Sequence, residues 1–293
     1  MTPYSRRHFL KTGVVAGALA STETLAIAAE RRTATDWVTL GKSDVKVTRL
    51  ALGTGTFGGR VQQQIGQEGL TRLVRHAYDR GIRFFETAES YGESQQMLAV
   101  ALKGIPRENY KLMSKVTTRS GVNPAQKLDA MRKNSNTDYF DIMLLHWQHT
   151  DTWPEDTRNW QDAILQAEAN KTILSHGASV HGLPALRQVP RTQWLQVAMI
   201  RVNHKGVSMD GEQFNTHGLG DVQEVVEHIK QARAAGMGVI SMKLIGEGAF
   251  DHADRQKAMR FAFRHAGVDS VTVGYKNTAE IDEAIDNVNL ALA

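Results

Sequence analysis

The stretch Arg83-Phe-Phe-Glu-Thr-Ala-Glu-Ser-Tyr-Gly-Glu93 joins a short apolar run to a polar loop. Within it, Glu86 and Tyr91 are five residues apart, where the apolar run predicts the end of a β-strand. An acid at a strand end and a tyrosine in the following loop can face one cleft. Because Lys115 and His146 close later predicted strands, the four titratable groups are predicted to meet in one pocket.

Apolar runs of roughly five to seven residues alternate with helix-length amphipathic segments from residue 47 onward. The predicted strands are 48–53, 82–87, 111–116, 140–145, 173–177, 196–202, 238–243 and 270–274. The clearest helices are expected at 70–80, 94–103, 221–235 and 279–288. About eight strand–helix units in about 245 residues predict an α/β fold, a single (β/α)8 TIM barrel over residues 36–293.

Polar side chains gather at the carboxyl ends of these predicted strands, where barrel enzymes carry their chemistry. Glu86, Tyr91, Lys115, His146, Ser179, His181 and Asn203 all lie at such ends. A phenol is a poor acid near neutral pH unless a nearby ammonium stabilises the phenolate. Taken singly, Tyr91 can be an ordinary loop residue and His146 a structural histidine. The combination predicts a site that polarises and protonates a carbonyl group.

The segment Gly53-Thr-Gly-Thr-Phe-Gly58 matches the dinucleotide-binding fingerprint of doubly wound folds. In that fold a helix starts inside the glycine run, whereas here a polar stretch delays the predicted helix to about residue 68. A glycine-rich loop at a barrel mouth, which lets the backbone approach a ligand, explains the same residues. The barrel is therefore favoured over the doubly wound alternative.

The sequence excludes or disfavours several other kinds of site. The chain has no cysteine, which excludes disulfides, thiolate zinc sites and cysteine nucleophiles. Histidine pairs 146/149 and 176/181 have no acidic partner at a ligand spacing, so no metal is expected. Asp251 to Asp254 is predicted to cap a helix. Three tryptophans, at 147, 153 and 160, either wall a substrate pocket or pack outside the barrel.

Residues 1–29 are predicted to be a twin-arginine export signal. Ser5-Arg-Arg-His-Phe-Leu-Lys11 precedes an apolar stretch at 12–20, and Ala26-Ile-Ala28 offers a cleavage site. We expect export to the periplasm by the Tat export machinery; an uncleaved cytoplasmic N-terminus is the alternative. The apolar stretch is too short for a stable membrane anchor. Cleavage lowers the net charge from +4 to about +2, which indicates no nucleic-acid partner.

The chain resembles the aldo-keto reductase family, the NADPH-dependent barrel oxidoreductases. The similarity runs through residues 40–57, 87–92, 111–116, 138–146 and 236–243 to the last predicted helix. The resemblance implies a catalytic tetrad of Glu86, Tyr91, Lys115 and His146. Glu86 departs from the usual aspartate, and its extra methylene is expected to move the carboxylate by about 1.5 Å.

The resemblance also implies NADP(H) as cofactor, with NAD less favoured. Leu244 to Gly248 are expected to cover the pyrophosphate, Lys276 to contact the 2′-phosphate, Asn287 the adenine and Ser179 the carboxamide. The family's usual glutamine, asparagine and arginine are replaced by Met199, Val180 and Glu283. The implied cofactor contacts are Gly53, Thr54, Ser179, Met199, Lys243, Leu244, Gly246, Gly248, Gly274, Lys276, Asn277 and Asn287.

The function implied is reduction of a small aldehyde or ketone by a monomeric barrel. Tyr91 is expected to protonate the carbonyl oxygen, Lys115 to lower the pKa of Tyr91, Glu86 to hold Lys115, and His146 to orient the carbonyl. The alternative is an exported, degenerate barrel that binds ligand or cofactor without efficient turnover. An isomerase or lyase on the same fold also stays open. The sequence does not identify the substrate.

Overall fold

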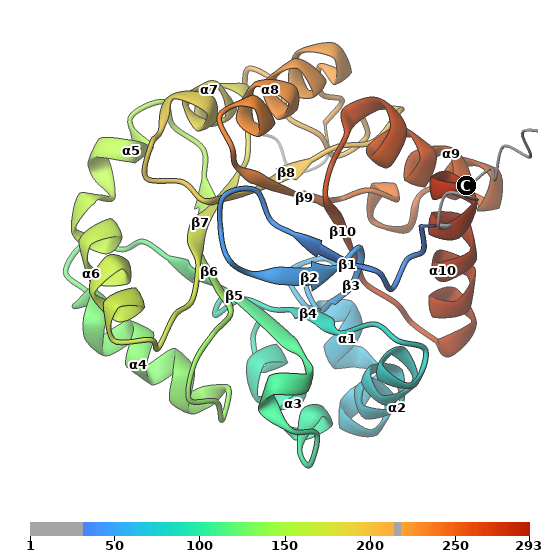
Figure 1. The fold of residues 1–293 in the computed structure, drawn as a ribbon, viewed down its shortest axis with the longest axis horizontal. Helices are drawn as coiled ribbons and strands as arrows, with labels where there is room; N and C mark the ends of the chain where they lie inside the picture. Colours follow the sequence, from blue (N-terminus) through green and yellow to red (C-terminus); the bar gives the residue numbers. More distant parts are fainter. Residues whose placement is uncertain (1–31, 214–217) are drawn as a thin grey trace, which may run out of the picture. The chain divides into compact units, whose positions relative to one another are not determined.

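The computed structural model describes residues 32–213 and 218–293, and the predicted export signal at 1–29 lies outside them (Figure 1). Eight parallel strands close into a barrel in the order β10-β3-β4-β5-β6-β7-β8-β9, which confirms the predicted TIM barrel. The barrel strands are β3 (Leu50–Gly53), β4 (Phe84–Glu86), β5 (Lys111–Thr117), β6 (Ile142–Gln148), β7 (His176–Val180), β8 (Val197–Arg201), β9 (Gly238–Met242) and β10 (Ser270–Val273).

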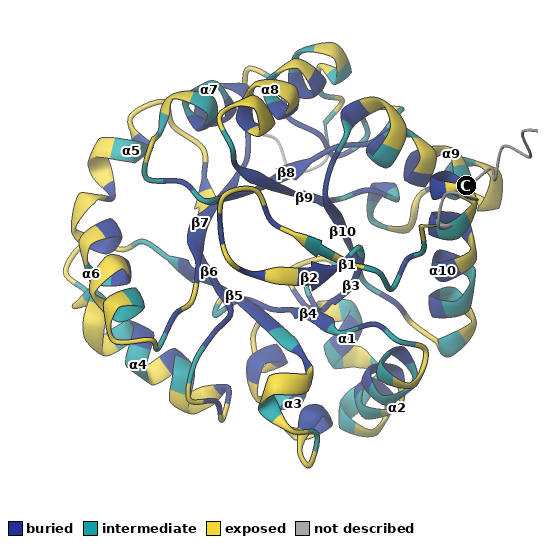
Figure 2. Ribbon diagram, in the orientation of Figure 1, coloured by how far each residue is buried: buried dark blue, intermediate teal, exposed yellow. Residues whose placement is uncertain are grey.

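Helices surround the barrel and turn their apolar sides toward it, so their outer faces are the exposed ones (Figure 2). They are α1 (Arg60–Gln64), α2 (Gly66–Asp79), α3 (Ser94–Leu102), α4 (Pro124–Asn134), α5 (Trp153–Asp156), α6 (Arg158–Ala169), α7 (Leu183–Gln188), α8 (Val222–Ala234), α9 (His252–Arg260) and α10 (Thr278–Leu292). Within the described part of the chain, no helix is long and apolar enough to cross a membrane.

A hairpin that the sequence pattern did not predict lies across one end of the barrel. Its strands β1 (Trp37–Thr39) and β2 (Lys46–Thr48) pair antiparallel, and Figure 1 shows them over the barrel centre. Leu40 and Val47 are fully buried and pack in the same apolar cluster as residues that begin barrel strands, such as Phe84 and Val197. The hairpin therefore closes the amino-terminal end of the barrel.

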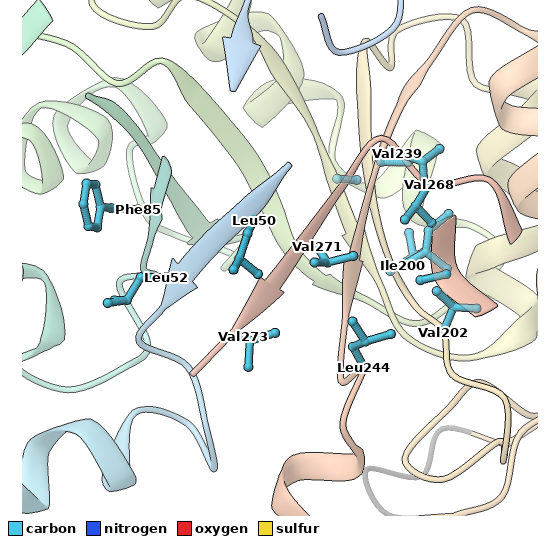
Figure 3. Close-up of a cluster of buried hydrophobic side chains, with 14 of the residues drawn as sticks. Leu50, Leu52, Phe85, Ile200, Val202, Val239, Leu244, Val268, Val271 and Val273 are labelled. Atoms are coloured by element: carbon cyan, nitrogen blue, oxygen red, sulfur yellow. The ribbon is translucent and has the colours of Figure 1, made fainter. Parts of the chain in front are cut away.

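Strand alternation divides the core into two layers. Leu50, Leu52 and Phe85 belong to the larger cluster between strands and helices (Figure 3), whereas Ala51 and Phe84 belong to the cluster inside the barrel. Successive side chains on a strand point to opposite faces. The period of two thus decides which polar residues at the strand ends face the barrel interior.

Two strands differ from their predicted limits by three residues at an end. β6 continues to Gln148 instead of ending at residue 145, and β7 starts at His176 instead of 173. The pairing of β6 with β7 shifts register between Leu145 and Gln148, as at a β-bulge. Ser179, predicted to follow β7, consequently lies inside that strand.

Candidate active site

The four predicted catalytic residues come from neighbouring strands and the loop after β4. On β4, alternation places Glu86 on the same face as Phe84, and on β5 it places Lys115 on the same face as Met113. On β6, His146 shares a face with Ile142 and Leu144. The apolar members of this set lie in the interior cluster. Alternation therefore brings the acid, the lysine and the histidine to the inside of the barrel at its carboxyl end.

Glu86 and Lys115 form a buried ion pair. Lys115 Nζ donates to Glu86 Oε1, and it also donates to the Thr87 carbonyl oxygen at 2.9 Å. Gly53 leaves space for the longer acid, because a Cβ at Gly53 would lie 2.8 Å from Glu86 Oε2. The glutamate therefore reaches Lys115 despite its extra methylene.

Tyr91 lies beside both Lys115 and His146. Lys115 Nζ is 4.7 Å from the centre of the Tyr91 ring, and the Tyr91 and His146 rings meet edge to face at 5.5 Å between centres. Gly55 supports the phenol from behind, since a Cβ there would lie 2.5–2.7 Å from ring atoms and the hydroxyl. The sequence pattern did not predict this role of Gly55, for which its place in the glycine-rich loop was the available signal.

His146 is positioned by Ser90 and by the β-bulge. Ser90 Oγ and His146 Nδ1 are 3.1 Å apart, and a hydroxyl donating there leaves the ring proton on Nε2. Trp147, the next residue, has a left-handed backbone with φ 69°. Both side chains line the same cavity, although ordinary alternation would separate them. Ser90 is a second supporting residue that the sequence pattern did not predict.

The electrostatics of the site are dominated by burial. Burial raises the pKa of Tyr91, and Glu247 adds to this effect. The net shift is upward, so any lowering of this pKa by Lys115, as predicted, is smaller than the effect of burial. Burial lowers the pKa of Lys115 well below its ordinary value, with a contribution from Lys243. Burial, followed by the charges of Lys115 and Lys243, also lowers the pKa of His146, which favours a neutral imidazole.

A cavity of about 450 Å³ connects the strand ends with α9 and α10. Glu86, Tyr91 and His146 line it, while Lys115 lies fully buried behind them. Eight predicted cofactor residues also line the cavity: Gly53, Met199, Lys243, Leu244, Gly248, Gly274, Lys276 and Asn287.

Four predicted cofactor residues are not among those that line this cavity. Thr54 is buried and its hydroxyl donates to the Glu86 carbonyl at 3.1 Å. Ser179 is buried with its hydroxyl 3.3 Å from His181 Nε2. Gly246 is buried in the short helical turn Gly246–Gly248. Asn277 is the N-cap of α10, where its side chain accepts from the Glu280 N–H at 3.0 Å.

The basic residues along the cavity have acidic neighbours. Lys243 pairs with Glu247, and both have left-handed backbones with φ 56° and 54°. Arg255 makes two bonds, of 2.7 and 2.9 Å, to Glu283. The backbone N–H of Lys276 donates to Glu280 at 2.7 Å. The cavity end near α10 is thus electrostatically mixed, with the Arg255 guanidinium held by the Glu283 carboxylate.

The remaining sequence candidates are resolved by packing. Trp147 lines the cavity, whereas Trp153 and Trp160 are 1% and 2% exposed in the core outside the barrel. The Asp251 side chain accepts from the Asp254 N–H at 2.9 Å, so the predicted helix cap is confirmed. Among residues 32–213 and 218–293, no three His, Asp or Glu side chains form a group able to hold a metal ion.

Known structures share this architecture. PA4992 of Pseudomonas aeruginosa is 21% identical, with a TM-score of 0.72 over 90% of this chain and 99% of that one. An aldo-keto reductase of Klebsiella pneumoniae in complex with NADPH is 16% identical, with a TM-score of 0.66 over 88% and 91% of the two chains. At these identities the likeness establishes the fold.

Sequence relatives point to the same group. "Probable aldo-keto reductase 1" of Glycine max is 23% identical over 239 residues, which are 73% of this chain and 60% of the soybean protein. Matches to the Bacillus subtilis and Mycolicibacterium smegmatis relatives span 53% and 58% of those proteins. The model of the aldo/keto reductase family matches residues 49–259. Because that match covers well over half of the sequence, this chain belongs to the aldo/keto reductase family.

Proposed function

We propose that this protein is an NADP(H)-dependent oxidoreductase that reduces the carbonyl group of a small aldehyde or ketone to an alcohol. The observation that carries the proposal is the position of Tyr91, which lines the cavity between the buried Lys115 ammonium and the His146 ring. An acid, a cation and a neutral donor at one point suit the protonation of a carbonyl oxygen.

In the proposed mechanism, Tyr91 donates its phenolic proton to the carbonyl oxygen. The ammonium of Lys115 stabilises the phenolate that remains, and Glu86 keeps Lys115 in place. His146, with its proton on Nε2, donates a hydrogen bond that orients the carbonyl. The nicotinamide cofactor, when bound, supplies the hydride for the carbonyl carbon.

The cavity fits a dinucleotide in two respects. Within the described ranges, Thr272 Oγ1 and Tyr275 Oη are buried without a hydrogen-bond partner, and both residues line the cavity. The backbone N–H groups at the start of α10, a helix of 15 residues, also favour an anion. Lys276 and Asn287 lie along the same wall and would contact the adenosine half.

The preference for NADP(H) over NAD(H) is the finer part of the proposal. Lys276 and Arg255 favour a 2′-phosphate, and the relative from Klebsiella pneumoniae is in complex with NADPH. Glu280 and Glu283 line the same end and oppose an added phosphate. We therefore expect a preference for NADPH of modest size, about tenfold.

The alternative is a degenerate barrel that binds a ligand or cofactor without efficient turnover. The replacement of the family's aspartate by Glu86 and of its glutamine by Met199 motivates it. Against it stands the ion pair between Glu86 and Lys115, which preserves the link that the reaction needs. We favour the reductase.

The first test is a titration of the protein with NADPH and NADH, followed by quenching of tryptophan fluorescence, since Trp147 lines the cavity. A panel of aldehydes and ketones then measures turnover. Tyr91→Phe should reduce kcat by about 1000-fold, because it removes the proton donor, and leave the Kd for NADPH within about twofold. Unchanged reduction by this variant would disprove the assignment of Tyr91, and no binding of either cofactor would favour the degenerate barrel.

We further propose that the chain is exported to the periplasm by the Tat machinery and acts there as a monomer. The paired arginines at 6 and 7 and the apolar stretch that follows support export. Gel filtration of the mature protein tests the oligomeric state.

A further inference from the structure

The wall of the cavity beside the proposed carbonyl site contains a second histidine. His181 directly follows β7, is 9% exposed and lines the cavity. Its ring lies edge to face with His146 at 6.4 Å between centres. The proposed mechanism does not use His181, so its place next to the reacting groups needs a separate explanation.

Arg201 fixes which nitrogen of His181 carries the proton. Arg201 Nη2 lies within hydrogen-bond distance of His181 Nδ1, and Arg201 is 1% exposed on the adjacent strand β8. A guanidinium can only donate hydrogen bonds, so Nδ1 must accept. A protonated imidazole has no accepting nitrogen. The contact therefore requires a neutral ring with its hydrogen on Nε2.

Asp210 contacts both Arg201 and the backbone next to His181. Asp210 Oδ1 is 3.5 Å from Arg201 Nε and accepts from the Gly182 N–H at 2.6 Å. Gly182 is the residue after His181, so one carboxylate fixes both the arginine and the backbone next to the histidine. Asp210 also balances the charge of Arg201. Burial, followed by the charge of Arg201, lowers the pKa of His181 well below its ordinary value.

The surroundings of Nε2 suit an uncharged oxygen. Ser179 Oγ is 3.3 Å away, at the long end of the range for N–H···O bonds. Met199 and Met242 line the same cavity with weakly accepting thioethers. A ligand oxygen that enters the cavity would compete with Ser179 for the hydrogen on Nε2.

We propose that His181 is a permanently neutral hydrogen-bond donor that binds a carbonyl or amide oxygen of the ligand in this cavity, with Arg201 as its positioning residue. The proposal rests on the proposed function for the identity of that ligand. The oxygen can belong to the carbonyl substrate or to the amide of the nicotinamide, and the experiment separates the two sources.

The tautomer is tested by NMR of the protein with ¹⁵N-labelled histidine, assigning His181 from the signals lost in His181→Gln. We expect a neutral Nε2–H ring from about pH 6 to about pH 8. A ring that titrates in this range, or carries its proton on Nδ1, overturns the proposal. This measurement needs neither cofactor nor turnover, so its result is independent of the proposed function.

Ligand binding is tested with His181→Phe, His181→Gln and the control His265→Gln, which changes an exposed histidine that is not among the residues lining the cavity. The probes are NADPH, followed by fluorescence, and benzaldehyde, followed by steady-state kinetics. Loss of the donor in His181→Phe should weaken one of the two by about tenfold, with partial recovery in His181→Gln, whose amide can donate. Thermal melting confirms that each variant is folded.

The pattern of losses identifies the source of the oxygen. A raised Kd for NADPH assigns it to the cofactor amide, and a raised KM for benzaldehyde with unchanged Kd assigns it to the substrate. No change in either constant overturns the proposal. A wild-type protein that binds NADPH without turnover contradicts the proposed function, while the Kd comparison still decides the role of His181.

Discussion

At the scale of single residues, the departure at Glu86 is compensated by its neighbours. The longer side chain still reaches Lys115, and the absence of a Cβ at Gly53 provides the space for its second oxygen. Gly53 is the last residue of β3, the strand paired with β4 in register with Glu86. The glycine at position 53 and the glutamate at position 86 therefore fit each other, and the site accommodates a glutamate.

Shortening this acid should accordingly impair the protein. Glu86→Asp would withdraw the carboxylate by about 1.5 Å from a lysine that is fully buried, leaving the ammonium poorly compensated. We expect kcat to fall by about tenfold or more, with little change in the Kd for NADPH. Steady-state kinetics with the preferred carbonyl substrate measure this. An increase in kcat would instead support a degenerate site that aspartate repairs.

The pH dependence of reduction follows from the directions of two pKa shifts. Tyr91 must be protonated to act as an acid, and burial together with Glu247 raises its pKa, so its proton is retained as pH rises. Burial lowers the pKa of His146, so that ring stays neutral at and above neutral pH. We expect kcat/KM for reduction to be flat from about pH 7 to about pH 9. A fall across this range would show that Tyr91, His146 or the buried Lys115, whose pKa burial lowers, titrates there.

The apolar pattern predicted that Glu86, Tyr91, Lys115 and His146 meet in one pocket because strand ends can be read from it, and the family resemblance supplied their expected roles. It could not predict the supporting contacts. Ser90, in the loop after β4, contacts His146 on β6, and Gly55 lies behind Tyr91 through a contact between two loops. Loop conformations depend on packing that no local pattern encodes.

At the scale of elements, the missed hairpin shows the same limit. Its strands are three residues each, too short for a clear alternation of apolar and polar residues. The hairpin is buried by packing against the barrel. Leu40 packs so closely on Gly238, the first residue of β9, that a Cβ at Gly238 would lie 2.6 Å from Leu40. The β-bulge in β6 could likewise not be predicted from the sequence, because one inserted residue leaves the apolar composition of the strand unchanged.

The hairpin should contribute substantially to stability. Leu40→Ala removes a fully buried side chain at the closed end of the barrel, and we expect a loss of about 3 kcal/mol in the free energy of unfolding. The matched control is Thr39→Ala at the exposed preceding position, with an expected change of about 0.5 kcal/mol or less. Urea denaturation followed by circular dichroism compares the two. Equal effects would mean that the hairpin does not seal the barrel.

At the scale of the whole molecule, the proposed export and the proposed cofactor must be reconciled. Nicotinamide cofactors are scarce outside the cytoplasm, whereas the Tat route carries proteins that have already folded. A barrel that folds first can bind its cofactor before transport. The cavity between the strand ends and α10 would then need to hold the cofactor tightly during transport.

This requirement makes export the decisive property to measure for the whole chain. Replacing Arg6 and Arg7 by lysine keeps the charge but removes the paired guanidinium groups of the proposed signal. We expect the double variant to accumulate in the cytoplasm as folded protein with the same Kd for NADPH, and the unchanged chain to appear in the periplasmic fraction with copurified nicotinamide. Fractionation with absorbance spectra of the purified protein measures both. Equal distribution of the two proteins would disprove the signal, and an exported protein without cofactor would mean that the reductant is supplied after transport.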